Sequence, residues 1–173
     1  MNNYIWLLVV IFIFHDMEEI VGMNKWLNKN YDSIVEKYPF AKKILSNYLG
    51  VSTGAFALAV YEELILLIVI CLLASITNSA IVYGIWFGGL VGFTLHLFIH
   101  IGQAIAIRSY IPALITSFIS IPPSILLILK TAPLMPLIEM NPAVIAGTII
   151  GILGVAINLK LAHNLMHLVA GKV

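Results

Sequence analysis

The stretch YEELILLIVICLLASI, Tyr61 to Ile76, decides the fold class because it is long and apolar and carries charge only near its start. A helix that crosses a bilayer needs about 20 mainly apolar residues, and the run that begins at Val51 meets this length. The stretch therefore predicts a membrane-spanning helix. It also places Glu62 and Glu63 inside that helix, where some other group must neutralise them.

Apolar runs of the same kind recur along the whole chain. The sequence has 173 residues, of which 61% are hydrophobic and only 10% are charged, whereas a soluble domain carries about 25% charged residues. We therefore expect an all-α, polytopic membrane helix bundle that forms a single domain over residues 1–173, with about five transmembrane helices. The expected helices cover residues 4–22, 51–76, 80–106, 111–130 and 142–170.

Two segments in the second half of the chain should interrupt this pattern. The fourth run contains SIPPS, Ser120 to Ser124. Its two prolines remove backbone hydrogen-bond donors, which predicts a helix that is kinked or broken near its middle. Residues 131–141, TAPLMPLIEMN, have the composition of an exposed loop.

The longest polar stretch, residues 23–47, sets the expected topology. It contains five of the nine basic residues, namely Lys25, Lys29, Lys37, Lys42 and Lys43. Cytoplasmic loops are enriched in Lys and Arg, so we expect this stretch in the cytoplasm, either as a short helix on the membrane surface or as a solvated loop. The N-terminus would then lie outside and the C-terminus inside, with the plasma membrane as the expected location. The net charge of +1 gives no basis for nucleic-acid binding.

All five histidines fall inside predicted spans, together with four glutamates. They are His15, His96, His100, His163 and His167, and Glu18, Glu19, Glu62 and Glu63. A charged side chain in the middle of a bilayer costs about 2.5–3.5 kcal/mol on insertion scales. Four unpaired glutamates would together be prohibitive, so the sequence predicts a group that neutralises them.

Helical spacing places these residues on shared faces. Residues three or four apart lie on one side of a helix, which groups His15 with Glu18 and Glu19. The i, i+4 spacing also joins His96 with His100, and His163 with His167. Two imidazoles at this spacing can approach one ion, as in the H-E-x-x-H motif of zinc enzymes.

Glycines at four-residue spacing lead into both histidine pairs. The stripes are Gly84, Gly88 and Gly92 before His96 and His100, and Gly147 and Gly151 before His163 and His167. Small residues at this spacing let membrane helices approach closely, so the face that packs against neighbours should carry the histidines inward. In the expected topology, the polar groups of four helices then reach one depth, between the bilayer centre and the cytoplasmic face.

The donors are imidazole nitrogens and carboxylate oxygens without thiolates, because Cys71 lies alone in an apolar run. Such donors suit iron, manganese or zinc rather than magnesium or calcium. Their number exceeds the three or four protein ligands of one zinc ion, which favours two divalent transition metal ions. The predicted ligands are His15, Glu18, Glu19, Glu62, Glu63, His96, His100, His163 and His167.

Further roles are assigned around these ligands. The four glutamates are also the candidate catalytic groups, and only one of each adjacent pair can easily face the site; the sequence does not choose between them. Gln103, Asn158 and Asn164 are predicted to hydrogen-bond to the ligands from outside. Asp16 and Arg108 are expected at the membrane interface, with Arg108 paired with Asp16 or with a lipid headgroup.

The sequence HDMEE, His15 to Glu19, resembles the motif of the HXXEE family of predicted membrane proteins. The stretch HLFIHIGQAIAIRSYIP, His96 to Pro112, and the histidine-bearing last helix are also similar to that family's pattern, so the resemblance spans most of the chain. It implies a membrane protein with a polar site and no named reaction. One position departs from the pattern, because a glycine is expected after Pro112 and this chain has Ala113.

A nitrogen–oxygen metal site inside a membrane favours an enzyme that acts on a lipid or another apolar small molecule. Iron would supply oxygen-dependent oxidation and zinc would supply hydrolysis, and paired histidines with several carboxylates slightly favour iron. The alternative is a proton- or ion-coupled transporter, because intramembrane His and Glu residues also relay protons. The oligomeric state does not follow from the sequence.

Overall fold

The computed structural model describes residues 2–135 and 141–170, and all regular secondary structure in these residues is helical. This confirms the predicted all-α class. The long helices are α2 (Leu7–Lys37), α4 (Thr53–Ile76), α5 (Ala80–Ile107), α6 (Leu114–Thr131) and α7 (Pro142–Ala170). The short ones are α1 (Asn2–Ile5) and α3 (Lys42–Leu45), with 3-10 turns at Pro39–Ala41, Ser46–Tyr48 and Ala132–Leu134.

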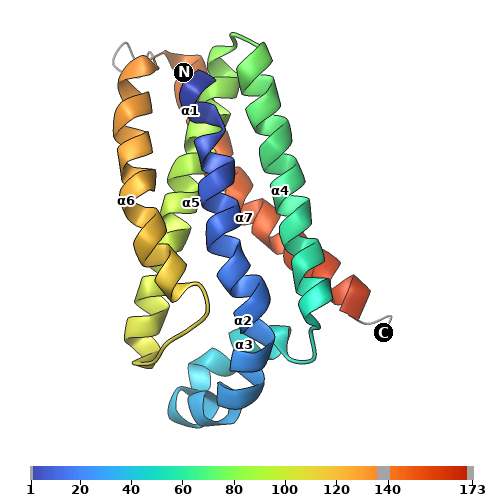
Figure 1. Ribbon diagram of the computed structural model, residues 1–173. Coiled ribbons are helices and arrows are strands. Elements are labelled where there is room, and N and C mark those ends of the chain that lie inside the picture. Colours follow the sequence, from blue (N-terminus) through green and yellow to red (C-terminus); the bar gives the residue numbers. More distant parts are fainter. Residues whose placement is uncertain (1, 136–140, 171–173) are drawn as a thin grey trace.

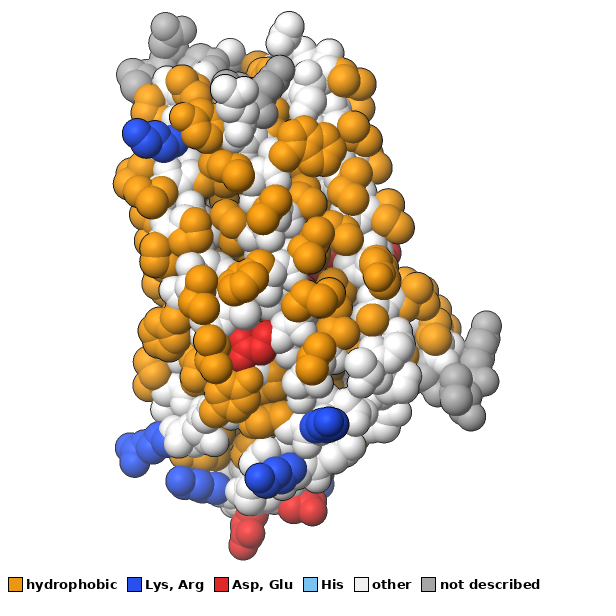
Figure 2. All heavy atoms as spheres, viewed as in Figure 1, with side chains coloured by type: hydrophobic (Ala, Val, Ile, Leu, Met, Phe, Trp, Pro, Cys, Tyr) orange, Lys and Arg blue, Asp and Glu red, His pale blue; other side chains and the backbone are white. Residues whose placement is uncertain are grey.

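Within the described ranges, four helices are long and apolar enough to cross a membrane. They cover Thr53–Ile76, Ala80–Ile107, Leu114–Leu134 and Pro142–Val169. The long helices run side by side, and the two chain ends lie at opposite ends of the bundle (Figure 1). Hydrophobic side chains cover most of the face in Figure 2, and most of its charged side chains gather at the end away from the N-terminus.

Helix α2 is longer than its apolar part. It continues without interruption from Leu7 to Lys37, so the polar residues 23–37 extend the first helix instead of starting a separate surface helix. Two side chains of this extension hold it to the loops at the same end of the bundle. The Asn24 side chain donates to the carbonyl oxygen of Val51 at 2.6 Å, and the Trp26 indole donates to that of Tyr110 at 2.7 Å.

Helix α6 stays helical through Pro122 and Pro123, so of the predicted kink or break the break does not occur. Both prolines are exposed, whereas Ser117, Ser120 and Ser124 are buried. The small serine side chains let α6 pack closely on its neighbours, and this packing holds the helix together where proline removes backbone hydrogen bonds. Of the loop expected at 131–141, residues 136–140 lie outside the described part of the chain.

Helices α5 and α7 pack through the predicted glycine stripes. A Cβ atom on Gly88 would overlap the carbonyl oxygen of Thr148, and one on Gly151 would overlap that of Ile85. The two backbones are therefore in direct contact at these positions. Beyond the crossing, α7 moves away from α5 towards the C-terminus (Figure 1).

Candidate metal site

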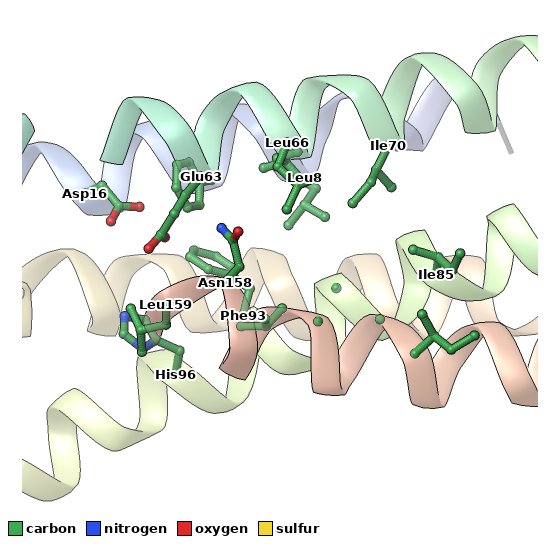
Figure 3. A pocket seen from close by; sticks show the side chains of 17 residues that line it. Leu8, Asp16, Glu63, Leu66, Ile70, Ile85, Phe93, His96, Asn158 and Leu159 are labelled. Atoms are coloured by element: carbon green, nitrogen blue, oxygen red, sulfur yellow. The ribbon is translucent and has the colours of Figure 1, made fainter. Parts of the chain in front are cut away.

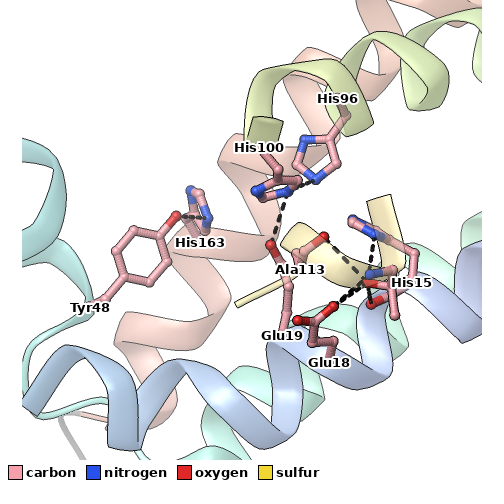
Figure 4. Close-up of polar contacts among 9 residues, drawn as sticks. His15, Glu18, Glu19, Tyr48, His96, His100, Ala113 and His163 are labelled. Carbon is pink, nitrogen blue, oxygen red and sulfur yellow. Dashed lines mark hydrogen bonds and ion pairs between the residues drawn. The ribbon is translucent and has the colours of Figure 1, made fainter. Parts of the chain in front are cut away.

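Three histidines and one glutamate converge between α2 and α5. His15, Glu19, His96 and His100 each offer one ligand atom, and these four atoms all lie within 4.8 Å of one another. His100 Nε2 lies 2.8 Å from His96 Nε2 and 3.0 Å from Glu19 Oε1 (Figure 4). We call these four residues the His/Glu cluster.

The cluster forms because one stripe of α2 faces one stripe of α5. His15 and Glu19 are four residues apart on α2, and His96 and His100 are four apart on α5, so each pair lies on one face of its helix. His15 is fully buried, Glu19 and His100 are 8% and 6% exposed, and His96 is half-buried. The donors therefore meet inside the bundle, away from lipid.

A hydrogen-bond chain from α6 orients the first of these ligands. The Thr116 hydroxyl donates to Glu18 Oε2 at 2.7 Å, and its oxygen lies 3.3 Å from His15 Nδ1. The contact with Glu18 is the shortest that the Thr116 hydroxyl makes, and with its proton there the Thr116 oxygen can accept from the His15 tautomer that carries a proton on Nδ1. The Nε2 atom of His15 then keeps its lone pair, as in metal-binding histidines whose other nitrogen is held by an outer partner.

Glu18 itself points away from the cluster and caps α6. Its Oε2 atom accepts the backbone N–H of Thr116 at 2.7 Å, and its Oε1 atom accepts the hydroxyl of Tyr110 at 2.6 Å. The residue at the N-cap position, Ala113, offers no capping side chain. A carboxylate from a neighbouring helix thus satisfies the free N–H groups and the positive dipole end of α6.

The donor set of the cluster fits a transition metal ion. With metal–ligand bonds of about 2.0–2.2 Å, ligand atoms around one ion lie roughly 3–4 Å apart, which matches the closest pairs here. Among the described residues, the Nε2 atom of His15 and the Nδ1 atom of His100 are buried without a hydrogen-bond partner. A cation among the four donors would satisfy the first of these and neutralise the Glu19 carboxylate.

A family model described as a protein of unknown function with HXXEE motif matches residues 6–127. The chain belongs to this family. Its HXXEE motif is His15 to Glu19, and the whole His/Glu cluster lies inside the matched range. Comparison with curated proteins and comparison with solved structures each found no match.

The second histidine pair, on α7, lies beyond the range matched by the HXXEE family model and apart from the cluster. His163 Nε2 is 2.7 Å from the Tyr48 hydroxyl, and His167 is exposed. The physical reason is the crossing of α5 and α7 at their glycines, because the two helices diverge before α7 reaches its histidines (Figure 1). His163 lines one cavity of about 280 Å³ together with Glu19, His96 and His100.

Of the other predicted site residues, some line the cavities and some are exposed. Asn158 donates to Glu62 Oε2 at 3.3 Å. Glu63 faces the interior and lines two cavities, one of which it shares with Asn158. Gln103 and Asn164 are exposed, although Gln103 reaches the edge of the second cavity. The ligand roles of these residues stay predictions.

Asp16, inside the HXXEE motif, is a site residue that sequence reasoning missed. It is 5% exposed and lines both cavities beside Glu63 (Figure 3), so the expectation of an interfacial residue paired with exposed Arg108 is wrong. Asp16 follows Phe12 by four residues and precedes Glu19 by three, which places it on the buried stripe. The stripe was hidden because this half of α2 is apolar on every side.

Two tyrosines next to the site, both outside the apolar spans, stay protonated. Burial, with the carboxylates of Glu19 and Glu63 nearby, raises the pKa of the Tyr48 hydroxyl above its ordinary value. Burial and the hydrogen bond to Glu18 raise the pKa of Tyr110 to about 12. Each phenol therefore keeps a proton to donate: Tyr110 donates to Glu18, and Tyr48 can donate to His163.

Proposed function

We propose that this member of the HXXEE family is a membrane-embedded metalloenzyme that acts on a lipid or another apolar molecule. The observation that carries the proposal is the convergence of four donor atoms within 4.8 Å, three from imidazoles and one from a carboxylate. A buried carboxylate needs a compensating charge in an apolar surrounding. A transition metal ion at the His/Glu cluster supplies it and uses the imidazole lone pairs as well.

One ion fits the cluster better than two. Four protein ligands are sufficient for a single ion, and of the second histidine pair His163 contacts Tyr48 while His167 is exposed. The expected second ion would need Asp16 and Glu63, which lie beside the cluster at the wall of the two cavities. With one carboxylate among four donors, the preference for iron over zinc weakens, and manganese also remains compatible.

The surroundings of the cluster suit a reaction inside the membrane. A bound ion would polarise a substrate oxygen or activate water or oxygen. The chain contributes the orientation of His15 through Thr116, the burial of three of the four donors, and His96 as the residue of the cluster that lines both cavities. A substrate in either cavity would therefore lie next to the ion.

We also propose that α2 is a fifth span, with the N-terminus outside and the C-terminus inside the cell. The support is the cluster of lysines on α2 and α3 at the end of the bundle away from the N-terminus (Figure 2), which the positive-inside rule assigns to the cytoplasm. The plasma membrane remains the proposed location. The His/Glu cluster would then lie in the cytoplasmic half of the bilayer.

The second candidate function, a proton- or ion-coupled transporter, is favoured by one observation. The two cavities share Asp16, Glu63 and His96 as lining residues, so they meet at an acidic, histidine-bearing wall. Intramembrane residues of this kind mark ion pathways in transporters. Flux that depends on pH and proceeds without bound metal would favour this function over the enzyme.

Elemental analysis of the purified protein tests the metal site. We expect about one transition metal ion per chain, the number that four ligands support. His100→Ala and Glu19→Gln should each lose most of it. His167→Ala, an exposed histidine outside the cluster, is the matched control and should retain the wild-type content. A folded wild-type protein with no metal above background would contradict the proposal.

A further inference from the structure

A cavity of about 370 Å³ lies between α2, α4, α5 and α7 and reaches the His/Glu cluster at His96. We propose that it binds a single-chain lipid whose head group donates hydrogen bonds to Asp16 and Glu63. The reaction of this lipid rests on the proposed metalloenzyme function, whereas the binding site itself stands on the geometry of the cavity.

The cavity has a long apolar part and one polar end. Figure 3 shows Asp16, Glu63, Asn158 and His96 together at one end, while Ile70 and Ile85 lie towards the other. From Ile85 to His96 the lining spans about 16 Å of α5 at 1.5 Å per residue. This length matches an extended hydrocarbon chain of about twelve carbons, and the volume lies within the usual range for small-molecule sites, about 300–1,000 Å³.

Glycines open one wall of the cavity. Gly89 and Gly154 both line it, and a Cβ atom on either would meet no described atom within 4 Å. Their neighbours Gly88 and Gly151 hold the two backbones together. At the helix crossing, Gly88 and Gly151 pack tightly against the neighbouring helix, whereas Gly89 and Gly154 face open space. The hydrocarbon chain fits in this space.

The polar end is a set of acceptors. Asp16 is 5% exposed, and its Oδ2 atom has no hydrogen-bond partner within the part of the chain that the structure describes. No Lys or Arg is found among the described residues that line the cavity. Asn158 donates one of its two amide N–H groups to Glu62, and its side-chain oxygen is an acceptor. A buried acceptor without a donor is costly, so an amine or alcohol head group is recognised and a carboxylate is not.

Because such a ligand comes from the membrane, the hydrophobic effect contributes little to its selection. A chain that leaves the bilayer for an apolar cavity gains little hydrophobic free energy, because both surroundings exclude water. Selection then depends on the head group and on the shape of the cavity. We expect one chain of limited length to bind, and we expect two-chain phospholipids to be excluded.

Photo-crosslinking tests the site in phospholipid nanodiscs. The probes are a diazirine-bearing dodecylamine and dodecanol, with the matching dodecanoic acid as the head-group control. The amine and the alcohol should label residues of α5 and α7 that line the cavity, and unlabelled dodecylamine should compete. Labelling by the acid equal to that by the amine would overturn the assignment of the head group.

Filling the cavity provides the matched variants. Gly89→Leu and Gly154→Leu should lower labelling about tenfold or more, because the added side chain takes the space of the hydrocarbon chain. Gly102→Leu is the control, since Gly102 is an exposed glycine of α5 that lines neither cavity. A Cβ atom added at Gly102 would meet no described atom within 4 Å. Gly154→Ala, with a single methyl group in the open space, gives an intermediate loss and serves if the leucine variants do not fold.

The metal content of the same samples separates the two proposals. Wild-type protein that labels as expected but holds no metal would retain the lipid site and reject the metalloenzyme. Wild-type labelling in Gly154→Leu that still holds metal would reject the lipid site alone. Asp16→Asn combined with Glu63→Gln should reduce labelling by the amine, and unchanged labelling would overturn the role of this carboxyl pair.

Discussion

Adjacent residues of an α-helix point about 100° apart, and the two glutamates of the HXXEE motif are separated by this angle. Glu19 faces α5 and joins His15, His96 and His100. Glu18 faces α6 and accepts hydrogen bonds from Thr116. The motif therefore combines one candidate metal ligand with one helix cap, and its histidine is connected to both.

This division predicts different results for two matched substitutions. The loss of an outer hydrogen-bond partner typically lowers metal affinity by about 10–100-fold. Glu19→Gln should lower it by more, because this substitution removes the only carboxylate of the cluster. Glu18→Gln should instead lower the free energy of unfolding by about 1 kcal/mol, as expected for a weakened cap. Metal titration and thermal unfolding in detergent measure the two effects, and a larger metal loss in Glu18→Gln would contradict the assignment.

Thr116 is predicted to act as a positioning residue for His15. Thr116→Val keeps the shape and removes the hydroxyl, so His15 Nδ1 loses its acceptor and metal affinity should fall by about 10–100-fold. Thr116→Ser restores the hydroxyl and should rescue the affinity. A purely structural threonine would show the same stability loss in Val and Ser variants without a difference in metal affinity.

At the scale of the helices, most boundaries could be predicted. Apolar runs end where helices end in α4, α5 and α7, because lipid requires both an apolar surface and a closed backbone over the same residues. The end of α2 was missed, since composition marks the edge of the membrane and the helix continues through polar residues to Lys37. The position of His163 was also missed. Four-residue spacing shows which face of a helix carries a residue, but it does not give the angle at which α5 and α7 cross.

The neighbouring glycines of α5 give a sharp test of helix packing. Gly88→Ala should destabilise the protein by about 1–3 kcal/mol, because the new methyl group overlaps the Thr148 carbonyl oxygen and the backbones must separate. Gly89→Ala meets no described atom, and the higher helix propensity of alanine should make it neutral or stabilising by up to about 1 kcal/mol. Thermal unfolding of both variants measures the difference, and equal effects would contradict the crossing of α5 and α7.

A related feature is Ala113, which precedes α6 with a φ angle of 76°. This left-handed backbone region favours glycine, which is the residue that the family resemblance leads one to expect there. The sequence departure therefore falls on a strained turn next to the cap formed by Glu18. It leaves the four residues of the His/Glu cluster unchanged.

For the whole molecule, the proposed orientation can be measured directly. In a Cys71→Ser background, cysteine at exposed position Ser33 should be protected from an impermeant reagent added outside the cell. Cysteine at exposed position Asn78, in the loop between α4 and α5, should react. The lysines of residues 23–47 are the physical reason, and the opposite labelling pattern would reverse the orientation.

The acidic residues of α2 also bear on how the chain enters the membrane during synthesis. Asp16, Glu18 and Glu19 interrupt the apolar part of the first helix, which is not among the four helices that qualify as spans by length and composition. Each unpaired acid opposes insertion by about 2.5–3.5 kcal/mol, and the partners of Glu18 and Glu19 lie on α5, α6 and their connecting loop, which are synthesised later. We therefore expect α2 to settle into the bilayer after these helices, so that assembly of the site and completion of the topology are one event.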